Sequence, residues 1–441
     1  MFDLSALGIE YGSLLMLVML LVLLMTGMPL AFVTGLVALF FVIFWIGPNA
    51  VPLITSRIYS FTNSYVFVAV PMFVLMASIL DKSGIAKDLF DAMKIFGGRL
   101  KGGVAIQTLA VAVVMATMSG IIGGETVLLG LLALPQMLRL GYDRNLAIGT
   151  VCAGGALGTM MPPSIVLIIY GLVANVSIGD LFTASFVPAA MLASMYVGYV
   201  LIRCHLNPAL APVIQTDEPD LPLGEKLKSI KGIILPVLVA FSVLGSIYGG
   251  VASVTEASGI GVVGIIISTW MRRELNCKMM RASCLRTLET CGMIIWIGVG
   301  ASVLVGVYNL MGGIHFVENL IIELGGGTPL AVLLVMMGIL FVLGMFLDWV
   351  GIALLTMPIF VPIIIKMGYD PIWFGVLFSM NMQISFITPP FGPAAFYLKS
   401  VAPKNITLNH IFRAMVPFIG LQVVALALLI TFPEIAMWWK D

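Results

Sequence analysis

Charged residues are scarce in this 441-residue sequence: they make up 10% of it, whereas hydrophobic residues make up 61%. The mean hydropathy is +1.13. Soluble domains carry about 25% charged residues, so this composition excludes a soluble globular protein. It predicts an all-α polytopic membrane protein, in which apolar stretches of about 20 residues cross the bilayer as helices.

The sequence also lacks three features that mark other classes of protein: an N-terminal basic segment, paired cysteines and clustered histidines. No Lys or Arg precedes Arg57, so the basic segment that opens a signal peptide is absent, and we expect the first apolar run to remain as a helix. The five cysteines form no CxxC pair, which argues against a metal cage and against a disulfide framework. The three histidines lie at the ends of apolar segments. A membrane enzyme would need clustered intramembrane His, Asp or Glu, so we predict no enzyme and no cofactor.

Two apolar segments contain a Pro-Pro pair, in GTMMPPSIVLIIYG at 158–171 and in SFITPPFGPAAFYL at 385–398. A proline inside a helix costs about 3 kcal/mol, because it removes a hydrogen bond and clashes with the preceding turn. In lipid, the freed backbone groups must be buried in protein or face a wet cavity. We therefore predict that 144–176 and 371–398 are each one crossing, made of two half-helices with an unwound middle.

Two other segments are too long for one crossing and too short for two. The segment 103–139 has Ser-Gly at 119–120 and Gly-Gly at 123–124, which leaves roughly 16 residues, or about 24 Å, on each side. This is shorter than the ~30 Å apolar core of a bilayer. We predict a re-entrant hairpin here and a second one at 328–366, which breaks near Asp348 and Gly351.

The basic residues lie mostly on one side of the membrane in this layout. With the N-terminus outside and each hairpin counted as no crossing, 19 of the 22 Lys and Arg residues fall inside, and Arg57, Lys366 and Lys440 fall outside. Such an excess marks the cytoplasmic side. Each half then has five crossings and one hairpin. Because five is odd, the second half is inverted relative to the first, and both termini are expected in the periplasm.

The two halves of the sequence also share motifs at matching positions. At an offset of 227 residues, Gly141-Tyr142-Asp143 and Pro162-Pro163 match Gly368-Tyr369-Asp370 and Pro389-Pro390 without a gap. The predicted domains are a first inverted repeat at 1–204, a proline-containing cytoplasmic linker at 205–231 and a second inverted repeat at 232–441.

Inverted repeats with broken helices are typical of secondary transporters, whose sites lie near the middle of the membrane. If each Pro-Pro pair starts a half-helix, the missing N–H groups cost nothing. The free N–H groups and the positive end of the helix dipole then suit a carboxylate. The unwound carbonyl groups before each pair suit a hard cation such as Na⁺. A channel is disfavoured, because the two halves are not arranged as pore-lining oligomer repeats.

The order of hairpin, Gly-Tyr-Asp and Pro-Pro in both halves, with VTEAS at 254–258, resembles the large membrane subunit of the tripartite ATP-independent periplasmic (TRAP) transporters. The resemblance covers nearly the whole chain. It implies an elevator-type, Na⁺-coupled importer of organic acids in the bacterial inner membrane; the substrate classes are C4-dicarboxylates, 2-oxo acids and sialic or sugar acids. It also implies two partners, a small four-helix membrane subunit and a periplasmic solute-binding protein. No four-helix extension precedes residue 1, so we expect the small subunit to be a separate chain.

Two motifs depart from the family pattern. The first hairpin tip is usually a Ser-Gly-Ser-Ser run and is Ser119-Gly120-Ile121-Ile122 here, so backbone carbonyls must carry more of any cation binding. The Thr-Pro-Thr-Glu-Ala stretch of the family is Ser253-Val254-Thr255-Glu256-Ala257 here, without the proline.

From the helix breaks, the hairpin tips and this resemblance we predict two overlapping sites, with Na⁺ as the coupling ion. The predicted Na⁺ site consists of Ser119, Gly120, Gly123, Gly158, Thr159, Asp348, Gly351, Gln383 and Thr388. The predicted substrate site consists of Thr159, Pro162, Pro163, Ser164, Pro389, Pro390 and Phe391.

Two acids in the hairpins have competing interpretations. Asp348 is the only acid in 328–366, and an acid inside a membrane usually serves function, so we assign it a cation or coupling role rather than that of an exposed tip. Glu125 could pair with a cation, face a water-filled cavity or cap the outgoing arm of its hairpin. It is the candidate for coupling.

Three other acids fit helix caps. Glu256 follows Ser253 by three residues, as in a capping box, and Asp143 and Asp370 follow Gly-Tyr at helix starts. The alternative function is a stand-alone Na⁺/organic-anion symporter. Such a protein would share the hairpins and the Pro-Pro breaks, but it would work without a binding protein.

Overall fold

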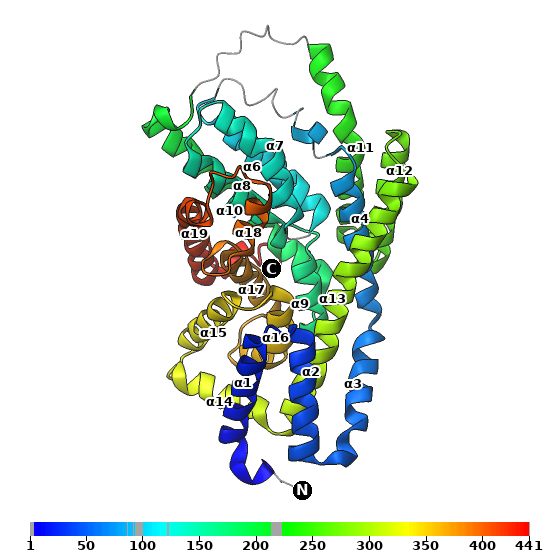
Figure 1. Cartoon of the computed structure of the whole chain (residues 1–441), viewed down its shortest axis with the longest axis vertical. Helices are drawn as coiled ribbons and strands as arrows, with labels where there is room; N and C mark the ends of the chain where they lie inside the picture. Colours follow the sequence, from blue (N-terminus) through cyan, green and yellow to red (C-terminus); the bar gives the residue numbers. More distant parts are fainter. Residues whose placement is uncertain are drawn as a thin grey trace.

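The computed structural model describes residues 4–85, 87–90, 92, 100–120, 123–212 and 223–440, except for the side chains of 223–233 and 236. Part of the predicted linker, 213–222, and the tip residues 121–122 therefore lie outside the described residues. The described residues form helices and no strand, as the composition predicted. Figure 1 shows the helices in two groups, which we call the arm and the body.

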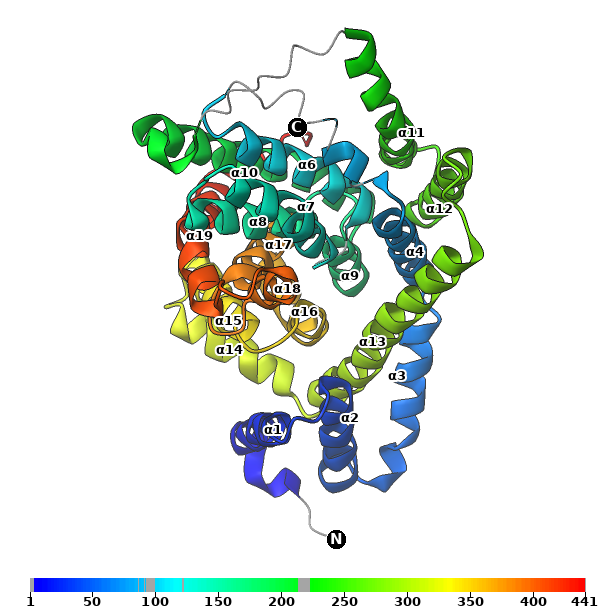
Figure 2. The ribbon, with the colours of Figure 1, turned by 45° about the horizontal axis from the view of Figure 1, so that its top comes forward.

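In Figure 2 the arm runs along one side of the molecule and continues below the body. Its helices are α1 (Gly8–Met25), α2 (Leu30–Phe41), α3 (Pro52–Thr62), α4 (Ala69–Lys82), α11 (Leu223–Tyr248), α12 (Val254–Met271), α13 (Cys277–Leu310) and α14 (Gly313–Leu324). The 34 residues of α13 reach about 51 Å. This helix contacts α2, α3 and α4, so it is the axis of the arm. α11 begins inside the segment predicted as linker.

The body contains the segments that were predicted as hairpins and broken helices. Its helices are α6 (Gly103–Ser119), α7 (Gly124–Arg139), α8 (Arg144–Ala156), α9 (Ile165–Ala174), α10 (Ile178–Leu206), α15 (Pro329–Gly344), α16 (Trp349–Lys366), α17 (Pro371–Ile387), α18 (Pro393–Val401) and α19 (Leu408–Thr431). α8 packs against α6, α7 and α19, and α17 packs against α10, α15 and α19. Helices from both halves of the chain therefore share one core.

Both predicted hairpins turn close to the expected positions. α6 ends at Ser119 and α7 starts at Gly124, and the two helices pack against each other. α15 ends at Gly344 and α16 starts at Trp349, with Asp348 as its N-cap residue. Gly351 lies inside the first turn of α16 and not in the connecting turn. The break of the second hairpin therefore comes a few residues before the position that Gly351 suggested.

Both Pro-Pro segments are broken, as predicted. α8 and α9 are separated by a 3-10 turn (Leu157–Thr159) and an irregular stretch, and α17 and α18 by residues 388–392. The prediction that each pair starts a half-helix is wrong. Ser164 and Gly392 are the N-cap residues of α9 and α18, so both pairs lie in the unwound segments before them. Ser164 has extended backbone angles, which a helix start at Pro163 would not allow.

The predicted helix caps are present. Asp143 and Asp370 accept hydrogen bonds of 2.9 and 2.7 Å from backbone N–H groups at the starts of α8 and α17. Ser253 and Glu256 form the capping box of α12. These bonds satisfy N–H groups that have no partner within their helices, so all three acids have a structural role.

Among the described residues, seven helices are long and apolar enough to cross a membrane, or up to eight if the bent pair α14–α15 counts as one span. The count of ten crossings and two hairpins remains a prediction. α16 has 18 residues, about 27 Å, so its length alone also permits a crossing. The sequence analysis missed α14, which meets α15 at 114°. Its apolar residues recur on one face only, so they form no continuous apolar run.

Cysteine labelling tests the predicted topology at exposed positions. Lys87, Lys278 and Glu323 are exposed and lie on segments that the charge pattern assigns to different sides. In a variant without the exposed native cysteines, we expect a membrane-impermeant maleimide to label K87C and K278C only from the cytoplasm. We expect E323C to be labelled only from the periplasm. Labelling of K87C from the periplasm would contradict the inverted arrangement; labelling of all three after detergent extraction is the control.

Candidate transport site

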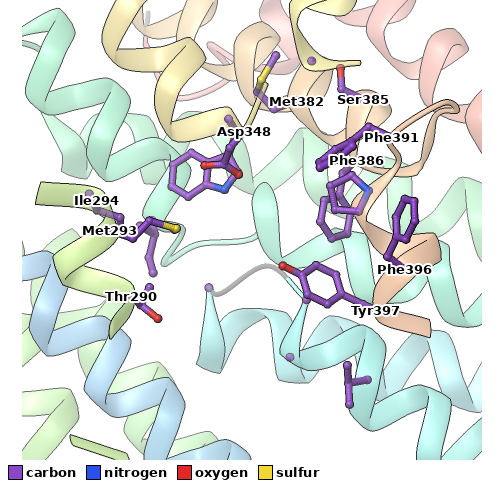
Figure 3. A pocket seen from close by; sticks show the side chains of 18 of the residues that line it. Thr290, Met293, Ile294, Asp348, Met382, Ser385, Phe386, Phe391, Phe396 and Tyr397 are labelled. Atoms are coloured by element: carbon purple, nitrogen blue, oxygen red, sulfur yellow. The ribbon is translucent and has the colours of Figure 1, made fainter. Parts of the chain in front are cut away.

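A cavity of about 960 Å³ lies between the arm and the body. α4 and α13 line it on the arm side, and both hairpin turns, the first residue of α9 and the region around the second break line it on the body side. Figure 3 shows the α13 side chains Thr290, Met293 and Ile294 on one side of the cavity. Asp348 and four aromatic residues of the body surround the remainder: Phe386, Phe391, Phe396 and Tyr397. Residues more than 300 positions apart thus share this space.

Charged side chains line the cavity on both sides. On the arm, Arg286 Nη1 of α13 lies 3.9 Å from Asp81 Oδ2 of α4; Asp81 is 7% exposed and Arg286 is 42% exposed. A methyl group on Gly124 would lie 2.7 Å from Asp81 Oδ2, so this ion pair touches the first hairpin. On the body, Asp348 is exposed to the cavity and accepts a 3.2 Å hydrogen bond from the backbone N–H of Val350.

The first hairpin turn contacts the first helix break and the half-helix α18. Gly120 has a φ of +54°, and a methyl group there would lie 2.2 Å from the carbonyl oxygen of Pro163. Gly123 has a φ of +98°, and a methyl group there would lie 2.7 Å from the ring of Tyr397 in α18. Both positions combine a left-handed backbone with a close contact, so both require glycine.

Glu125 lies where the first hairpin meets the first break. Its side chain is buried and accepts a hydrogen bond from the Ser119 hydroxyl across the turn. A methyl group on Gly158 would lie 2.8 Å from Glu125 Oε1, so the carboxylate sits directly against the end of α8. Among the described residues, no group donates a hydrogen bond to Glu125 Oε2. The carboxylate is therefore close to two predicted Na⁺ site residues, Ser119 and Gly158, but it does not line the cavity.

The first break forms a hydrogen bond with the second half of the chain. The carbonyl oxygen of Thr159 accepts hydrogen bonds from the hydroxyls of Ser164, at 2.5 Å, and of Ser379 in α17, at 2.9 Å. Pro162 and Pro163 are buried beside it. These contacts bring the predicted residues of the first break together, and they close that break off from the cavity except at Ile165.

The second break is more open. Pro390 and Phe391 are exposed, and Phe391 lines the cavity, whereas Thr388 is buried and donates a 2.6 Å hydrogen bond to the carbonyl of Ile384. Gln383 is fully buried in α17, and neither of its amide atoms has a hydrogen-bond partner among the described residues. An unsatisfied buried amide costs about 1–3 kcal/mol, so a polar ligand or water beside Gln383 would lower the free energy of the fold.

Gly351 packs against the arm and not against the other predicted Na⁺ site residues. A methyl group there would meet Leu30 of α2 at 2.3 Å and Ile297 of α13 at 4.0 Å. This glycine lets α16 approach the arm closely. Its position is therefore at the surface where body and arm touch.

The sequence analysis missed the arm side of the cavity. Arg286 was counted only among the basic residues of the predicted cytoplasmic side, and Asp81, Ser385 and Tyr397 were not considered as site residues. The sequence gives only a weak signal for Arg286. This residue lies one helical turn before Thr290, on a helix face that is apolar from Met293 onward. No sequence pattern predicts that Arg286 pairs with Asp81, which lies 205 positions earlier.

The cavity and its surroundings offer oxygen ligands of mixed kind. No group of three or more His, Cys, Asp or Glu side chains suited to a metal occurs among the described residues. The other oxygen groups are carbonyls and hydroxyls of the breaks and the carboxylates of Asp81, Glu125 and Asp348.

The fold is similar to that of a solved membrane transporter. The solved structure of the Alcanivorax borkumensis YdaH transporter matches it with a TM-score of 0.59 and covers 88% of each chain. At 14% sequence identity, this likeness concerns the fold alone.

The sequence comparisons identify the family. The family model described as "Tripartite ATP-independent periplasmic transporter, DctM component" matches residues 17–435, so the chain belongs to that family. Its relatives include the ectoine TRAP transporter large permease TeaC of Halomonas elongata, 31% identical over 85% of this chain and 86% of the relative. The C4-dicarboxylate large permease DctM of Pseudomonas aeruginosa is 29% identical over 88% of this chain and 90% of the relative.

This membership confirms the resemblance inferred from the sequence. The chain is a large permease of a TRAP transporter and a multi-pass protein of the inner membrane. Large permeases of this family work with a small membrane subunit and a periplasmic binding protein. In one relative, the isethionate permease DctMQ of Oleidesulfovibrio alaskensis, the chain matches 64% of a longer protein.

Proposed function

We propose that this chain is the subunit that moves a small organic acid anion across the membrane, driven by Na⁺, after delivery by the binding protein. The observation that carries the proposal is the meeting of both hairpin turns and the second break at one cavity, with Asp348 on the body and Arg286 on the arm. A carboxylate beside unwound backbone suits Na⁺, and a guanidinium suits a carboxylate or sulfonate.

The elevator motion and the inverted repeat are part of the same proposal. Two features support the motion: the body holds both breaks in one core, and α16 meets the arm along α13 at a glycine contact. The shared order of hairpin, Asp-capped helix, Pro-Pro break and half-helix in both halves supports the repeat. In this proposal the body slides along the arm and carries Na⁺ and substrate with it.

The names of the relatives support the substrate class. They are permeases for C4-dicarboxylates, ectoine, isethionate and sialic acid, all of which carry a carboxylate or a sulfonate group. We therefore propose an organic acid for this chain, in the class of C4-dicarboxylates, 2-oxo acids or sugar acids.

Dependence on the partners is the test of this function. Reconstituted alone in liposomes with an inward Na⁺ gradient, the chain should transport nothing above background. Addition of the small subunit and the loaded binding protein should restore uptake, because delivery and the complete membrane complex are both needed. Rapid Na⁺-driven uptake by the chain alone would instead favour a stand-alone Na⁺/organic-anion symporter. Uptake that ignores Na⁺ would contradict the coupling.

A further inference from the structure

A second cavity, of about 440 Å³, lies between the arm and the body at the end of α13 opposite to Arg286. Its arm side carries Arg57, Ser60 and Ser64, from α3 and the residues after it, and Ser302 and Asn309 from α13. Its body side is apolar. Arg57 is the only charged side chain among the described residues that line it.

Helical spacing places these polar groups in two facing stripes. Arg57 and Ser60 are three residues apart and so share a face of α3, Ser64 follows the end of that helix, and Ser302 and Asn309 are two turns apart on α13. Arg57 packs closely on α13: a methyl group on Gly306 would lie 2.8 Å from its Nε atom. The apolar body therefore faces a polar strip of the arm that includes one positive charge.

The charge of Arg57 is not neutralised by the protein. Among the described residues, no Asp or Glu lies within ion-pair distance of Arg57, and its side chain is exposed. An arginine on a rigid helix beside hydroxyl and amide groups is suited to bidentate binding of a carboxylate.

The two cavities stand at opposite ends of the same helix. Arg286 and Gly306 are 20 residues apart on α13, which corresponds to about 30 Å, the thickness of the apolar core of a bilayer. The arm thus presents one guanidinium to the body toward each end of α13. The charge pattern of the sequence places Arg57 on the outer side and Arg286 on the inner side.

We propose that Arg57, with Ser60 and Asn309, is the outward-facing anion site of the arm, which holds the carboxylate of the substrate when the body is at the outer end of its travel. The inference rests on the proposed function and adds to it a specific residue and side. The same chemistry would bind the phosphate of an anionic lipid, and the experiment must distinguish these two sources.

A charge-sensitive labelling experiment tests the site without knowledge of the substrate. In the full transporter, with Cys277 and Cys284 replaced by Ser, S60C is labelled from outside with an anionic and with a cationic methanethiosulfonate reagent. The ratio of the two rates should favour the anionic reagent. Arg57→Gln should lower this ratio at least roughly fivefold, the factor expected for a unit charge a few ångström away in water. An unchanged ratio would overturn the proposal.

Uptake then tests the role in transport. Succinate, pyruvate and sialic acid are offered in turn with their binding proteins, and the substrate that gives Na⁺-dependent uptake is used. Arg57→Gln should reduce its initial rate about tenfold, Arg57→Lys should retain part of it, and the control Arg281→Gln, an exposed arginine of the same α13, should not change it. Normal uptake by Arg57→Gln would overturn the inference. Absence of Na⁺-dependent uptake in every variant and in the parent would instead contradict the proposed function.

Changing the lipid composition distinguishes the substrate carboxylate from the lipid phosphate as the ligand of Arg57. In vesicles of phosphatidylcholine alone, the effect of Arg57→Gln on uptake should persist, and the substrate should slow labelling of S60C by the anionic reagent. An effect that appears only when phosphatidylglycerol is present would assign Arg57 to a lipid headgroup and overturn the substrate site.

Discussion

Asp348→Asn is expected to abolish Na⁺-driven uptake while the protein still folds and inserts. Asn has nearly the same shape and is also a good N-cap, so the hydrogen bond to Val350 and the start of α16 should survive. The substitution removes a charge that is open to the cavity. An acid inside a membrane costs roughly 2.5–3.5 kcal/mol on insertion scales, which a bound cation would offset.

The measurement is the initial rate of uptake against external Na⁺ in proteoliposomes. We expect the rate to fall by about 100-fold at a fixed Na⁺ concentration, or the Na⁺ concentration for half-maximal uptake to rise at least about tenfold, which corresponds to about 1.4 kcal/mol. The matched control is Asp143→Asn, which makes the same change at the N-cap of α8, outside the cavity. Unchanged Na⁺ dependence in Asp348→Asn would make Asp348 a structural cap only.

Gly120→Ala should also stop transport, through geometry and not through charge. The added methyl group would lie 2.2 Å from the carbonyl oxygen of Pro163, an atom that cannot rotate away. Overpacking of this kind costs typically 1–3 kcal/mol, and the left-handed backbone adds about 1–2 kcal/mol. The hairpin turn should therefore move off the first break and disrupt the surroundings of Glu125 and Ser119.

The control separates the clash from the backbone strain. Gly312 has a φ of +81° and no atom within 4 Å of a methyl group, so Gly312→Ala has the strain alone. We expect this variant to unfold in detergent at a slightly lower temperature and to transport normally. Gly120→Ala should lose nearly all uptake at a temperature where the protein is still folded. Equal uptake by the two variants would show that contact between the hairpin and the break is not needed.

The sequence alone determined the membrane class, both helix breaks, the turn of the first hairpin and the family. Each of these depends on residues that are close together in the chain. Gly120 and Gly123 favour the left-handed backbone that the first hairpin turn needs, and two adjacent prolines break a helix through local clashes and lost hydrogen bonds. The Asp143 and Asp370 caps and the Ser253–Glu256 box were predictable for the same reason, because a cap bonds within its own first turn.

The tertiary structure decided which residues share a site. Asp348 and Gly351 are three positions apart, yet one faces the cavity and the other faces Leu30 of the arm, because Asp348 is the extended N-cap residue before α16 and Gly351 lies in its first turn. The pairing of Asp81 with Arg286 joins two helices across 205 positions. No local pattern encodes such contacts, since they depend on how the helices pack.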